Sequence, residues 1–424
     1  MGNAFVSADD SRSTSRQPAL DAQPGAGGEE ERHLEAVARP AVAPRGERRQ
    51  RRPGGHSGDR TLSQAMSPRN RQSPGDMPES LWNRIADLPL AVESLALERL
   101  QAPAPAERVT TLVRLRGAGA EGVGEEIGPN EDHDALTALA PTLPLAGDWT
   151  LDTFVEHLAG VELWPAPPEW EMARRWRTWA FESAALDLAL RQAGLGLPEA
   201  LGRDPRPVRF VNSLGLGSPP ELGAIARRLD RYPGLRFKLD AHASWSPELA
   251  GEVAATGAVD VIDFKGRYGL PVEDEFALLA MYEAVLARFD GVILEDPHDG
   301  PDVAALVEPH AARVSFDAPI ATPGDVESAA FGARIVNVKP SRIGGVRPLL
   351  DVYAYCEAHG IRMYGGGMGE VGPARGQIQL LASLFHPDAP NDVAPSLYNL
   401  PDLPDGLPTS PLPPPAEILG FRWA

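Results

Sequence analysis

Short apolar segments recur from residue 206 onward, and each is followed by a stretch in which apolar residues have helical spacing. The starts of these segments are about 22 to 32 residues apart. The eight segments are 208–215, 235–241, 259–266, 291–297, 313–320, 334–341, 361–367 and 392–396. Eight strand–helix units of this size predict an α/β fold, a parallel (β/α)8 TIM-like barrel over residues 206–395. An open, doubly wound sheet is less favoured, because no glycine fingerprint follows the first strand.

The residues before this barrel have a mixed pattern. Residues 80–100 and 108–128 are predicted as strands, since Thr, Val and Leu alternate with polar residues in the second segment. Residues 150–200 are predicted as helices, and Gly194 stands where a C-terminal helix cap is expected. We therefore expect an α+β capping domain over residues 77–205. The Pro-rich and then apolar segment 396–424 is expected to return to that domain.

The first 76 residues differ from the rest in composition. They hold seven Val, Leu and Phe residues together and a single aromatic residue, Phe5. A segment with so little apolar surface cannot offset the chain entropy lost on folding, so residues 1–76 are predicted to be a disordered tail. The arginine-rich run 45–55 is compatible with a nucleic-acid-binding arm, but a solvated tail is the simpler interpretation. A further alternative is that Met77 is the start of the protein.

Net charge limits the partners of the folded part. The chain carries a formal charge of −19, and residues 1–76 contribute 12 Arg against 10 acidic residues, so the remainder carries −21. A body this acidic repels nucleic acid and anionic lipid, and we expect it to bind neither. The start of the chain lacks the apolar core of a secretory signal, and no apolar run reaches the ~18 residues of a membrane span, so a cytoplasmic protein is expected. A homo-oligomer is compatible with the sequence, which does not determine the oligomeric state.

Cysteine and lysine are both rare in this chain. The single cysteine, Cys356, excludes an internal disulfide framework and a thiolate-rich metal site. Of the 40 basic residues, 37 are Arg and three are Lys: Lys238, Lys265 and Lys339. All three lysines stand at the carboxyl ends of predicted strands, where barrel enzymes hold their chemistry. Because Lys can lose its proton and Arg cannot, these lysines are candidates for acid–base work.

Acidic residues occupy the neighbouring strand ends. Asp263, Glu295 and Asp317 end the third, fourth and fifth predicted strands. Oxygen donors alone suit a hard cation, Mg²⁺ first and Mn²⁺ second. A cation here would lower the pKa of the lysines around it by charge repulsion and make them usable bases near neutral pH. The structural alternative is a layer of Lys–Asp ion pairs with no metal.

Several motifs occur together in a fixed order along the barrel. They are "ILEDP" at 293–297, "FDAPI" at 316–320, "VNVKPSRIGGV" at 336–346 and "YGGGMGEVGPARGQIQLLASL" at 364–384. In this order and spacing they resemble the enolase superfamily, in its muconate-lactonizing and mandelate-racemase-like branch. Segments 111–128 and 184–202 resemble the capping domain of that family, so the resemblance covers about residues 80–424.

This resemblance implies a Mg²⁺-assisted enzyme that removes the proton α to a carboxylate of a small substrate and passes through an enediolate. Such enzymes include racemases and epimerases, cycloisomerases and dehydratases. The family pattern implies Asp263, Glu295 and Asp317 as metal ligands and Lys339 as a catalytic lysine. Sites of this superfamily combine Lys or His bases with Mg²⁺, because an α-proton is too weakly acidic for a lone amine.

Two positions depart from the family pattern. The usual Lys-x-Lys of the second strand is Lys238-Leu239-Asp240, and the usual Asp-x-Asn of the third strand is Asp263-Phe264-Lys265. We interpret Lys265 as the displaced second lysine, facing the substrate opposite Lys339, with Lys238 neutralising the substrate carboxylate. In an alternative register Asp240 would be the third-strand metal ligand. Asp263 is favoured, because it precedes Glu295 by 32 residues, one unit, whereas Asp240 precedes it by 55.

Three further residues are candidates for substrate binding: Asp240, His298 and Glu370. For His298 the simpler interpretation is a solvent-facing ring, and Glu370 would otherwise bind a lysine or face solvent at the rim. Two other functions remain open. Lys339 could form a Schiff base in a metal-free barrel aldolase, or the chain could be a non-catalytic enolase-like binding protein.

Overall fold

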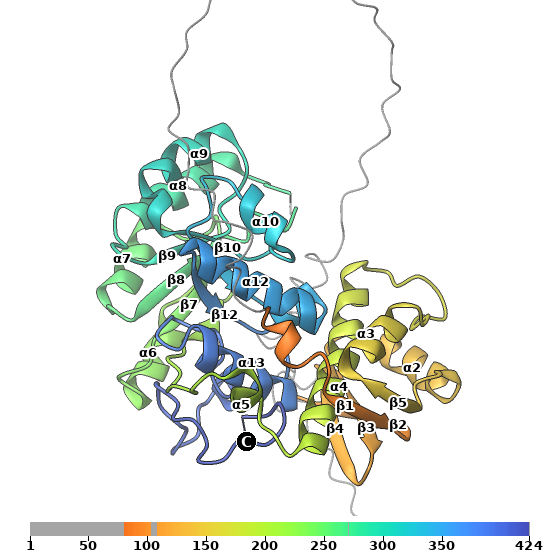
Figure 1. Cartoon of the computed structure of the whole chain (residues 1–424). Helices are drawn as coiled ribbons and strands as arrows, with labels where there is room; N and C mark the ends of the chain where they lie inside the picture. Colours follow the sequence, from red (N-terminus) through yellow and green to blue (C-terminus); the bar gives the residue numbers. More distant parts are fainter. Residues whose placement is uncertain (1–79, 103–107, 270, 424) are drawn as a thin grey trace, which may run out of the picture.

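The computed structural model describes residues 80–102, 108–269 and 271–423. The predicted disordered tail, residues 1–76, lies outside these residues. Figure 1 shows an N-terminal module beside a larger body in which helices surround a sheet. Among the described residues, no helix combines the length and apolarity that crossing a membrane requires.

The N-terminal module is built on a three-stranded antiparallel sheet in the order β2-β3-β4. A two-stranded antiparallel ribbon, β1 with β5, lies beside it. The strands are β1 (Pro89–Val92), β2 (Ser94–Gln101), β3 (Val109–Gly117), β4 (Ala120–Glu126) and β5 (Gly147–Thr150). The helices are α2 (Asn130–Leu139), α3 (Leu151–Ala159), α4 (Met172–Ala193) and α5 (Leu197–Leu201), with 3-10 turns η1 (Trp82–Arg84) and η2 (Ala140–Thr142).

Helix α4 lies directly on strand β4 because two glycines leave room for it. A Cβ atom on Gly122 would stand 2.2 Å from the Ala184 carbonyl oxygen, and one on Gly124 would stand 1.9 Å from that of Ala180. Helix α4 ends at Gly194, which has a φ of 69°, in the left-handed conformation expected of a C-terminal cap. The prediction of a strand beginning at residue 80 is wrong in its first part, because the chain forms the 3-10 turn η1 there. The buried Trp82 in this turn donates its indole N–H to Asp152.

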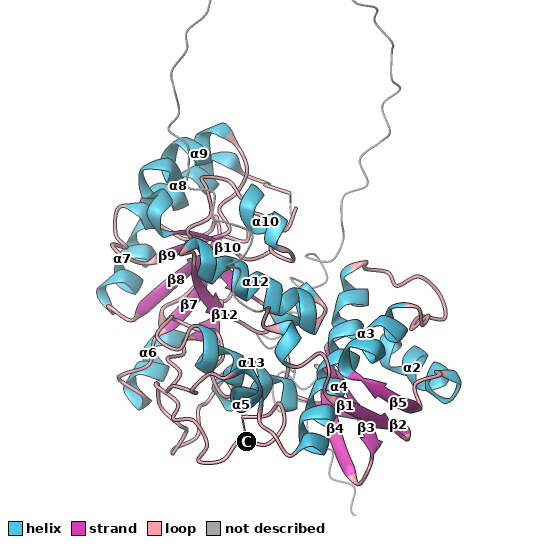
Figure 2. Ribbon diagram, in the orientation of Figure 1, coloured by secondary structure: helices cyan, strands magenta, loops and turns pink. Residues whose placement is uncertain are grey.

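The larger body holds a seven-stranded parallel sheet in the order β12-β11-β10-β9-β8-β7-β6 (Figure 2). Its strands are β6 (Asn212–Leu214), β7 (Phe237–Asp240), β8 (Val259–Asp263), β9 (Ile293–Glu295), β10 (Val314–Phe316), β11 (Ile335–Val338) and β12 (Arg362–Gly365). Its helices are α6 (Gly223–Arg231), α7 (Pro247–Ala255), α8 (Glu275–Leu286), α9 (Pro301–Val307), α10 (Pro323–Ser328), α11 (Pro340–Ile343), α12 (Val346–His359) and α13 (Pro373–Phe385). Two 3-10 segments, η3 (Glu308–Arg313) and η4 (Ser396–Asn399), complete it. The sequential strand order and intervening helices are those of a TIM-type barrel.

The eighth predicted strand is not formed. In its place are two isolated parallel bridges, one of Asn391, just before the predicted segment 392–396, with Phe210 and one of Asp392 with Gly366, and they join the two edges of the sheet. The Asn391 side chain adds bonds of its own, accepting from the Gly365 N–H at 2.8 Å and donating to the Arg209 carbonyl at 3.0 Å. Prolines at positions 390 and 395 explain why a full strand does not form here, because each lacks the N–H that a ladder needs.

The end of the described chain returns to the N-terminal module. Gly420 forms a bridge with Gly196, and the Phe421 ring packs edge-on against Trp179 with centroids 6.1 Å apart. The carboxylate of Asp187 on α4 accepts from the Phe421 N–H at 2.8 Å and from Arg422 at 2.7 Å. Asp187 is fully buried, so its charge depends on these donors.

Replacing Asp187 with alanine is expected to lower the free energy of unfolding by about 3–5 kcal/mol, because Arg422 and several N–H groups lose a buried acceptor. Urea unfolding followed by circular dichroism measures the change. Asp388→Ala is the matched control, since Asp388 is an exposed partner of Arg206 and its loss should cost no more than about 1 kcal/mol. Equal losses in the two variants would contradict an anchoring role for Asp187.

Glu182 links the module to the larger body. Its carboxylate accepts from the backbone N–H of Val346, the first residue of α12, at 2.7 Å. Burial raises the pKa of Glu182 to about 7, and the Val346 hydrogen bond opposes that rise only in part. The folded chain therefore binds this proton more tightly than the unfolded chain does.

We expect Glu182 to make the folded chain less stable as pH rises from about 4.5 to 7. Below that window the carboxyl is protonated in both states; above it the folded chain holds a buried charge, which costs about 3 kcal/mol. Glu182→Gln should remove the contribution of Glu182 to this loss of stability, and above pH 7 the variant should be more stable than the parent. Unfolding curves of both proteins between about pH 4 and pH 8 measure this; parallel stability profiles would contradict it.

Candidate functional site

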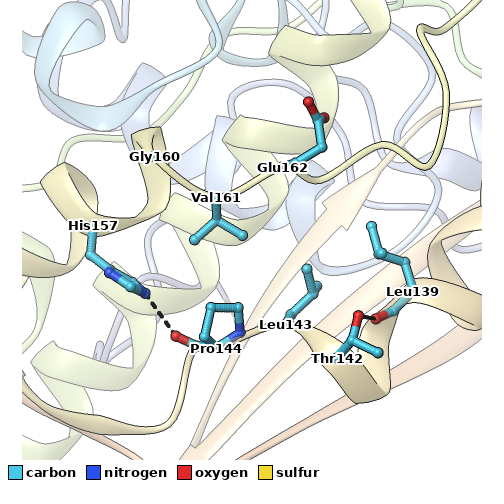
Figure 3. Close-up of a pocket in the computed structure, with 8 residues that line it drawn as sticks. All are labelled: Leu139, Thr142, Leu143, Pro144, His157, Gly160, Val161 and Glu162. Carbon is cyan, nitrogen blue, oxygen red and sulfur yellow. Dashed lines mark hydrogen bonds between the residues drawn. The ribbon is translucent and has the colours of Figure 1, made fainter.

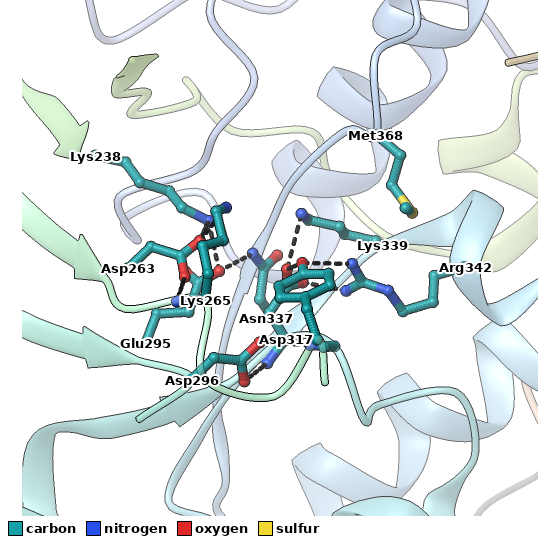
Figure 4. A network of polar contacts seen from close by, with 12 residues as sticks. Lys238, Asp263, Lys265, Glu295, Asp296, Asp317, Asn337, Lys339, Arg342 and Met368 are labelled. Carbon is teal, nitrogen blue, oxygen red and sulfur yellow. Dashed lines mark hydrogen bonds and ion pairs between the residues drawn. The ribbon is translucent and has the colours of Figure 1, made fainter. Parts of the chain in front are cut away.

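Three carboxylates from consecutive strands lie together at the carboxyl end of the sheet (Figure 4). Asp263 ends β8, Glu295 ends β9 and Asp317 follows β10 directly, and the register pairs Asp263 with Glu295. One oxygen from each lies within 4.8 Å of the other two. All three side chains are fully buried. We call Asp263, Glu295 and Asp317 the acidic triad.

Lys238 on β7 lies between two carboxylates of the triad. Its Nζ atom is 2.5 Å from Oε1 of Glu295 and 3.1 Å from Oδ2 of Asp263, and the residue is 1% exposed. Burial alone would lower the pKa of Lys238, but Asp263 and Glu295 outweigh it and raise the value well above 10.5. Lys238 is therefore a charged partner of the triad.

Lys265 lies just beyond the end of β8 and contacts two acidic residues. Its Nζ atom is 2.5 Å from Oδ2 of Asp263 and 3.2 Å from Oδ1 of Asp240. Burial would lower the pKa of Lys265, but Asp240 and Asp263 outweigh it and raise the value well above 10.5. The backbone φ of Lys265 is 54°, in the left-handed region that is strained for a residue other than glycine. Asp240 and Lys265 thus form an ion pair between neighbouring strand ends.

Lys339 follows β11 and donates to Oδ2 of Asp317 at 2.9 Å. Oδ1 of the same carboxylate accepts from Arg342 on α11. Burial lowers the pKa of Lys339, and the positive charges of Arg342 and Lys238 act in the same direction, against the opposing effect of Asp317. Of the three lysines, Lys339 is the one whose pKa is lowered, which suits it best to accept a proton.

The triad itself is electrostatically unbalanced. Burial and the neighbouring Asp263 raise the pKa of Glu295 to about 8, although Lys238 opposes them. The pKa of Asp317 is lowered, because Arg342 and Lys339 outweigh the effect of burial. Carboxylates this close repel one another, and a proton or a cation relieves that repulsion.

Three residues around the triad were not recognised from the sequence as site residues. Asp296 accepts from the backbone N–H groups of Asp317 and Ala318 at 2.9 and 2.8 Å. Tyr268, in the loop after β8, donates its hydroxyl to Oδ2 of Asp317 at 2.7 Å. Tyr364 on β12 donates to Oε2 of Glu295. Tyr364 stands near the end of a predicted strand, which is a signal that could have found it; no feature of the sequence distinguishes Tyr268.

The other two substrate-binding candidates, His298 and Glu370, also contact protein groups. His298 is engaged with Tyr282, whose hydroxyl lies 3.0 Å from the ring Nδ1. Glu370 is buried, accepts from the Ser341 hydroxyl at 2.9 Å and accepts from the Met368 N–H at 2.7 Å. These contacts organise the loops next to the triad. Figure 4 shows Met368 beside Lys339 and Arg342, on the other side of the triad from Lys238.

The donor set of the triad fits a hard divalent cation. It consists of carboxylate oxygens without sulfur or imidazole, the set preferred by Mg²⁺ and Mn²⁺. The amide of Asn337, two residues before Lys339, lies against Glu295, and its Oδ1 is buried without a hydrogen-bond partner. A buried acceptor left unpaired, on a side chain that contacts Glu295, is costly unless an electropositive group lies next to it.

A hollow lies in the N-terminal module, between the α2–β5 connection and α3 (Figure 3). His157 lines it and contacts the Pro144 carbonyl at 2.7 Å, and the exposed Glu162 stands at its edge. The ring of His157 also stacks on Trp149. The residues that line this hollow bring no second carboxylate or lysine to His157, so the acidic triad is the stronger candidate site.

Two domain descriptions of one family, "Domain of unknown function (DUF8230)", match this chain: the N-terminal domain at residues 83–200 and the C-terminal domain at 204–400. An N-succinylamino acid racemase of Amycolatopsis sp is 30% identical over 230 residues, which cover 51% of this chain and 60% of that protein. An o-succinylbenzoate synthase of Bacillus subtilis is 25% identical over 222 residues, 51% of this chain and 58% of that protein. The chain thus matches less than two thirds of the length of these relatives. An N-succinylamino acid racemase of Thermus thermophilus is 29% identical over 337 residues, 73% of this chain and 84% of that protein.

Solved structures share the fold at lower identity. A muconate cycloisomerase from Pseudomonas fluorescens has a TM-score of 0.53 at 23% identity, covering 72% of this chain and 87% of that one. A mandelate racemase/muconate lactonizing protein from Herpetosiphon aurantiacus has a TM-score of 0.57 at 19% identity, with coverages of 72% and 90%. A dipeptide epimerase from Methylococcus capsulatus, in complex with a Mg ion, has a TM-score of 0.53 at 19% identity, with coverages of 74% and 88%.

Proposed function

The chain belongs to the DUF8230 family, whose domain models match residues 83–200 and 204–400, and on that premise we propose that it is a Mg²⁺-dependent isomerase or lyase of the enolase superfamily, in its muconate-lactonizing and mandelate-racemase-like branch. The proposed reaction removes the proton α to a carboxylate of a small substrate and passes through an enediolate. Within this class we favour a racemase or epimerase over a cycloisomerase or dehydratase. Lysines on both sides of the triad support that choice, since the proton could then leave one face of the α-carbon and return to the other.

One observation carries the proposal: three buried carboxylates within 4.8 Å of one another, with an amine on either side. Asp263, Glu295 and Asp317 would hold the cation. Their closeness supports Asp263 rather than Asp240 as the ligand from this part of the barrel. When bound, the cation would supply positive charge that stabilises the oxyanion developing on the substrate carboxylate.

We propose Lys339 and Lys265 as the two general bases. Lys339, with its lowered pKa, is suited to take the α-proton. Lys265 would serve the opposite face, held there by the carboxylate of Asp240 at 3.2 Å. Lys238, bound between Asp263 and Glu295, would balance the charge of those ligands rather than reach the substrate carboxylate.

The charges of the site support a carboxylate substrate. Among the described residues, the cluster holds five acidic side chains and four basic ones: Asp240, Asp263, Glu295, Asp296 and Asp317 with Lys238, Lys265, Lys339 and Arg342. With all of them ionised, the cluster carries one net negative charge. With a divalent cation bound it would carry one net positive charge, and one substrate carboxylate would neutralise it.

The test is the exchange of substrate α-hydrogen with D₂O, followed by proton NMR, across a set of small carboxylates with Mg²⁺ present. N-succinylamino acids come first, because two relatives are named as N-succinylamino acid racemases. We expect exchange that stops on chelation with EDTA and returns with Mg²⁺. Absence of exchange over the whole set, in protein that binds Mg²⁺, would contradict the proposal.

The two alternatives have no support among the relatives found. A Schiff-base aldolase using Lys339 would be trapped by borohydride with substrate in EDTA, and we expect no trapping. A non-catalytic binding protein would show no metal-dependent exchange with any carboxylate.

A further inference from the structure

The acidic triad receives two kinds of hydrogen-bond donor. Lysine and arginine donors bring positive charge, which a bound cation would repel. Four other donors are neutral. They are the Lys265 backbone N–H on Oδ1 of Asp263 at 3.0 Å, the Tyr364 hydroxyl on Oε2 of Glu295, the Tyr268 hydroxyl on Oδ2 of Asp317 at 2.7 Å and, at the longer distance of 3.4 Å, the Asn337 amide on Oε1 of Glu295. A neutral donor orients a carboxylate and leaves its charge available to a cation.

The direction of the Tyr268 hydrogen bond is fixed by its neighbour. A guanidinium has donors and no acceptor, so Nη2 of Arg342, at 3.0 Å, must donate to the phenolic oxygen. The single proton of Tyr268 is therefore left for Asp317. Tyr268 thus stands in the middle of a chain of three groups: an upstream donor, a phenol and a carboxylate of the triad.

Tyr364 has the same arrangement on the other side of the site. With a cation bound, Glu295 would be ionised and could only accept, so the Tyr364 hydroxyl donates to it. The Ser315 hydroxyl, 2.9 Å away, then donates to the phenolic oxygen. Two tyrosines, one from a loop and one from a strand, therefore direct their protons at two different carboxylates of the triad.

Both phenols are held in place by their surroundings. Tyr364 is fully buried on β12. The ring of Tyr268 lies near two cationic groups, with Lys265 Nζ 5.6 Å and Arg342 Cζ 5.9 Å from its centroid. The loop that carries Tyr268 is fixed at Gly266, where a Cβ would stand 2.2 Å from the backbone nitrogen of His298. Rigid donors of this kind are what a preorganised ligand set requires.

We propose that Tyr268 and Tyr364 are positioning residues of the cation site, each orienting one carboxylate of the triad for a divalent cation. The inference rests on the proposed function, in that it takes the triad as the Mg²⁺ ligands. It adds two residues that act on the cation through Asp317 and Glu295 and that have no contact with substrate in the proposed chemistry.

The test uses the full chain with Tyr268→Phe or Tyr364→Phe, which remove one hydroxyl and keep the ring. Calorimetric titration with Mg²⁺, and separately with Mn²⁺, should show a dissociation constant raised about 10- to 100-fold in each variant. The Mn²⁺ electron paramagnetic resonance spectrum gives a readout that is independent of turnover and should change in both. Tyr398→Phe is the matched control, because this buried tyrosine donates to the Pro408 carbonyl, and its cation affinity should stay within twofold of the parent.

The outcomes separate the two proposals. If the parent binds cation and both variants stay within twofold of it, the positioning role is overturned and the proposed function stands. If the parent binds neither Mg²⁺ nor Mn²⁺, both are overturned. Should Tyr364→Phe not fold, as judged by far-ultraviolet circular dichroism, Ser315→Ala replaces it. That variant removes only the upstream donor, and a dissociation constant raised about fivefold supports the role, whereas an unchanged one counts against it.

Discussion

Lys339→Ala is expected to slow removal of the substrate α-proton from one face of the α-carbon by about 10²- to 10⁴-fold. Lys339 follows β11 and Lys265 follows β8, so the two amines reach the triad from strands separated by β9 and β10. In the variant, Lys265 still serves the other face. We therefore expect Lys339→Ala to retain α-hydrogen exchange for one enantiomer and Lys265→Ala to retain it for the other, while neither interconverts the two.

The measurement is the loss of the α-proton NMR signal in D₂O, recorded for each enantiomer separately with Mg²⁺ present. Lys339→Arg is the control that separates charge from basicity, because it keeps a cation beside Asp317 but cannot release a proton at neutral pH. We expect it to be as slow as Lys339→Ala. Exchange at the parent rate in Lys339→Arg would rule out Lys339 as a base. Loss of exchange for both enantiomers in either alanine variant would rule out two bases on opposite faces.

Asp263→Asn is expected to weaken Mg²⁺ binding by at least about 100-fold. Changing a residue that only hydrogen-bonds to a metal ligand lowers metal affinity about 10- to 100-fold, and this substitution removes a charged ligand itself. The strand supplies its own control. Asp260 stands three residues earlier on β8, where its carboxylate is held by Arg209 at 2.8 Å and Arg236 at 2.5 Å. Asp260→Asn removes one negative charge from the same strand and should leave the Mg²⁺ dissociation constant within twofold.

Calorimetric titration of both variants with Mg²⁺ distinguishes a local ligand from a general effect of charge. Equal weakening in Asp260→Asn and Asp263→Asn would indicate that the acidic body as a whole attracts the cation, with no role for the triad as a site. Unchanged binding in both would move the site elsewhere. Circular dichroism of each variant shows whether the fold is retained, because Asp263→Asn also removes a partner of Lys238 and Lys265.

Much of this architecture could be predicted from the sequence, because strand ends carry their own signal. Short Val- and Ile-rich runs that end in an acidic residue or a lysine fix both the strand and the direction of its last side chain. That is why Asp263, Glu295 and Asp317 could be grouped before any coordinates were known. The rarity of lysine added a second, independent signal for Lys238, Lys265 and Lys339.

Other features depend on distances that no sequence pattern states. Tyr268 reaches Asp317 from 49 positions away, through a loop whose path is set by contact of Gly266 with His298. The pKa directions of Lys238 and Lys339 differ because one lies between two carboxylates and the other beside Arg342. The eighth strand, residues 392–396, was predicted but does not form. The prolines at 390 and 395 disfavour strand pairing more than Val393 and Ala394 favour it.

The joint between β12 and β6 determines where we expect the barrel to open locally. The other neighbouring strands pair directly in parallel ladders, with a register shift between β7 and β8, whereas here two isolated bridges and the Asn391 side chain connect the first strand to the last. We expect local opening to cost less at an irregular joint of this kind than along a regular ladder. Within the described part of the chain, the wall of the barrel therefore has its weak seam at this joint. We therefore expect local opening of the folded protein to begin at this joint, on the opposite side of the barrel from Asp263 and Glu295.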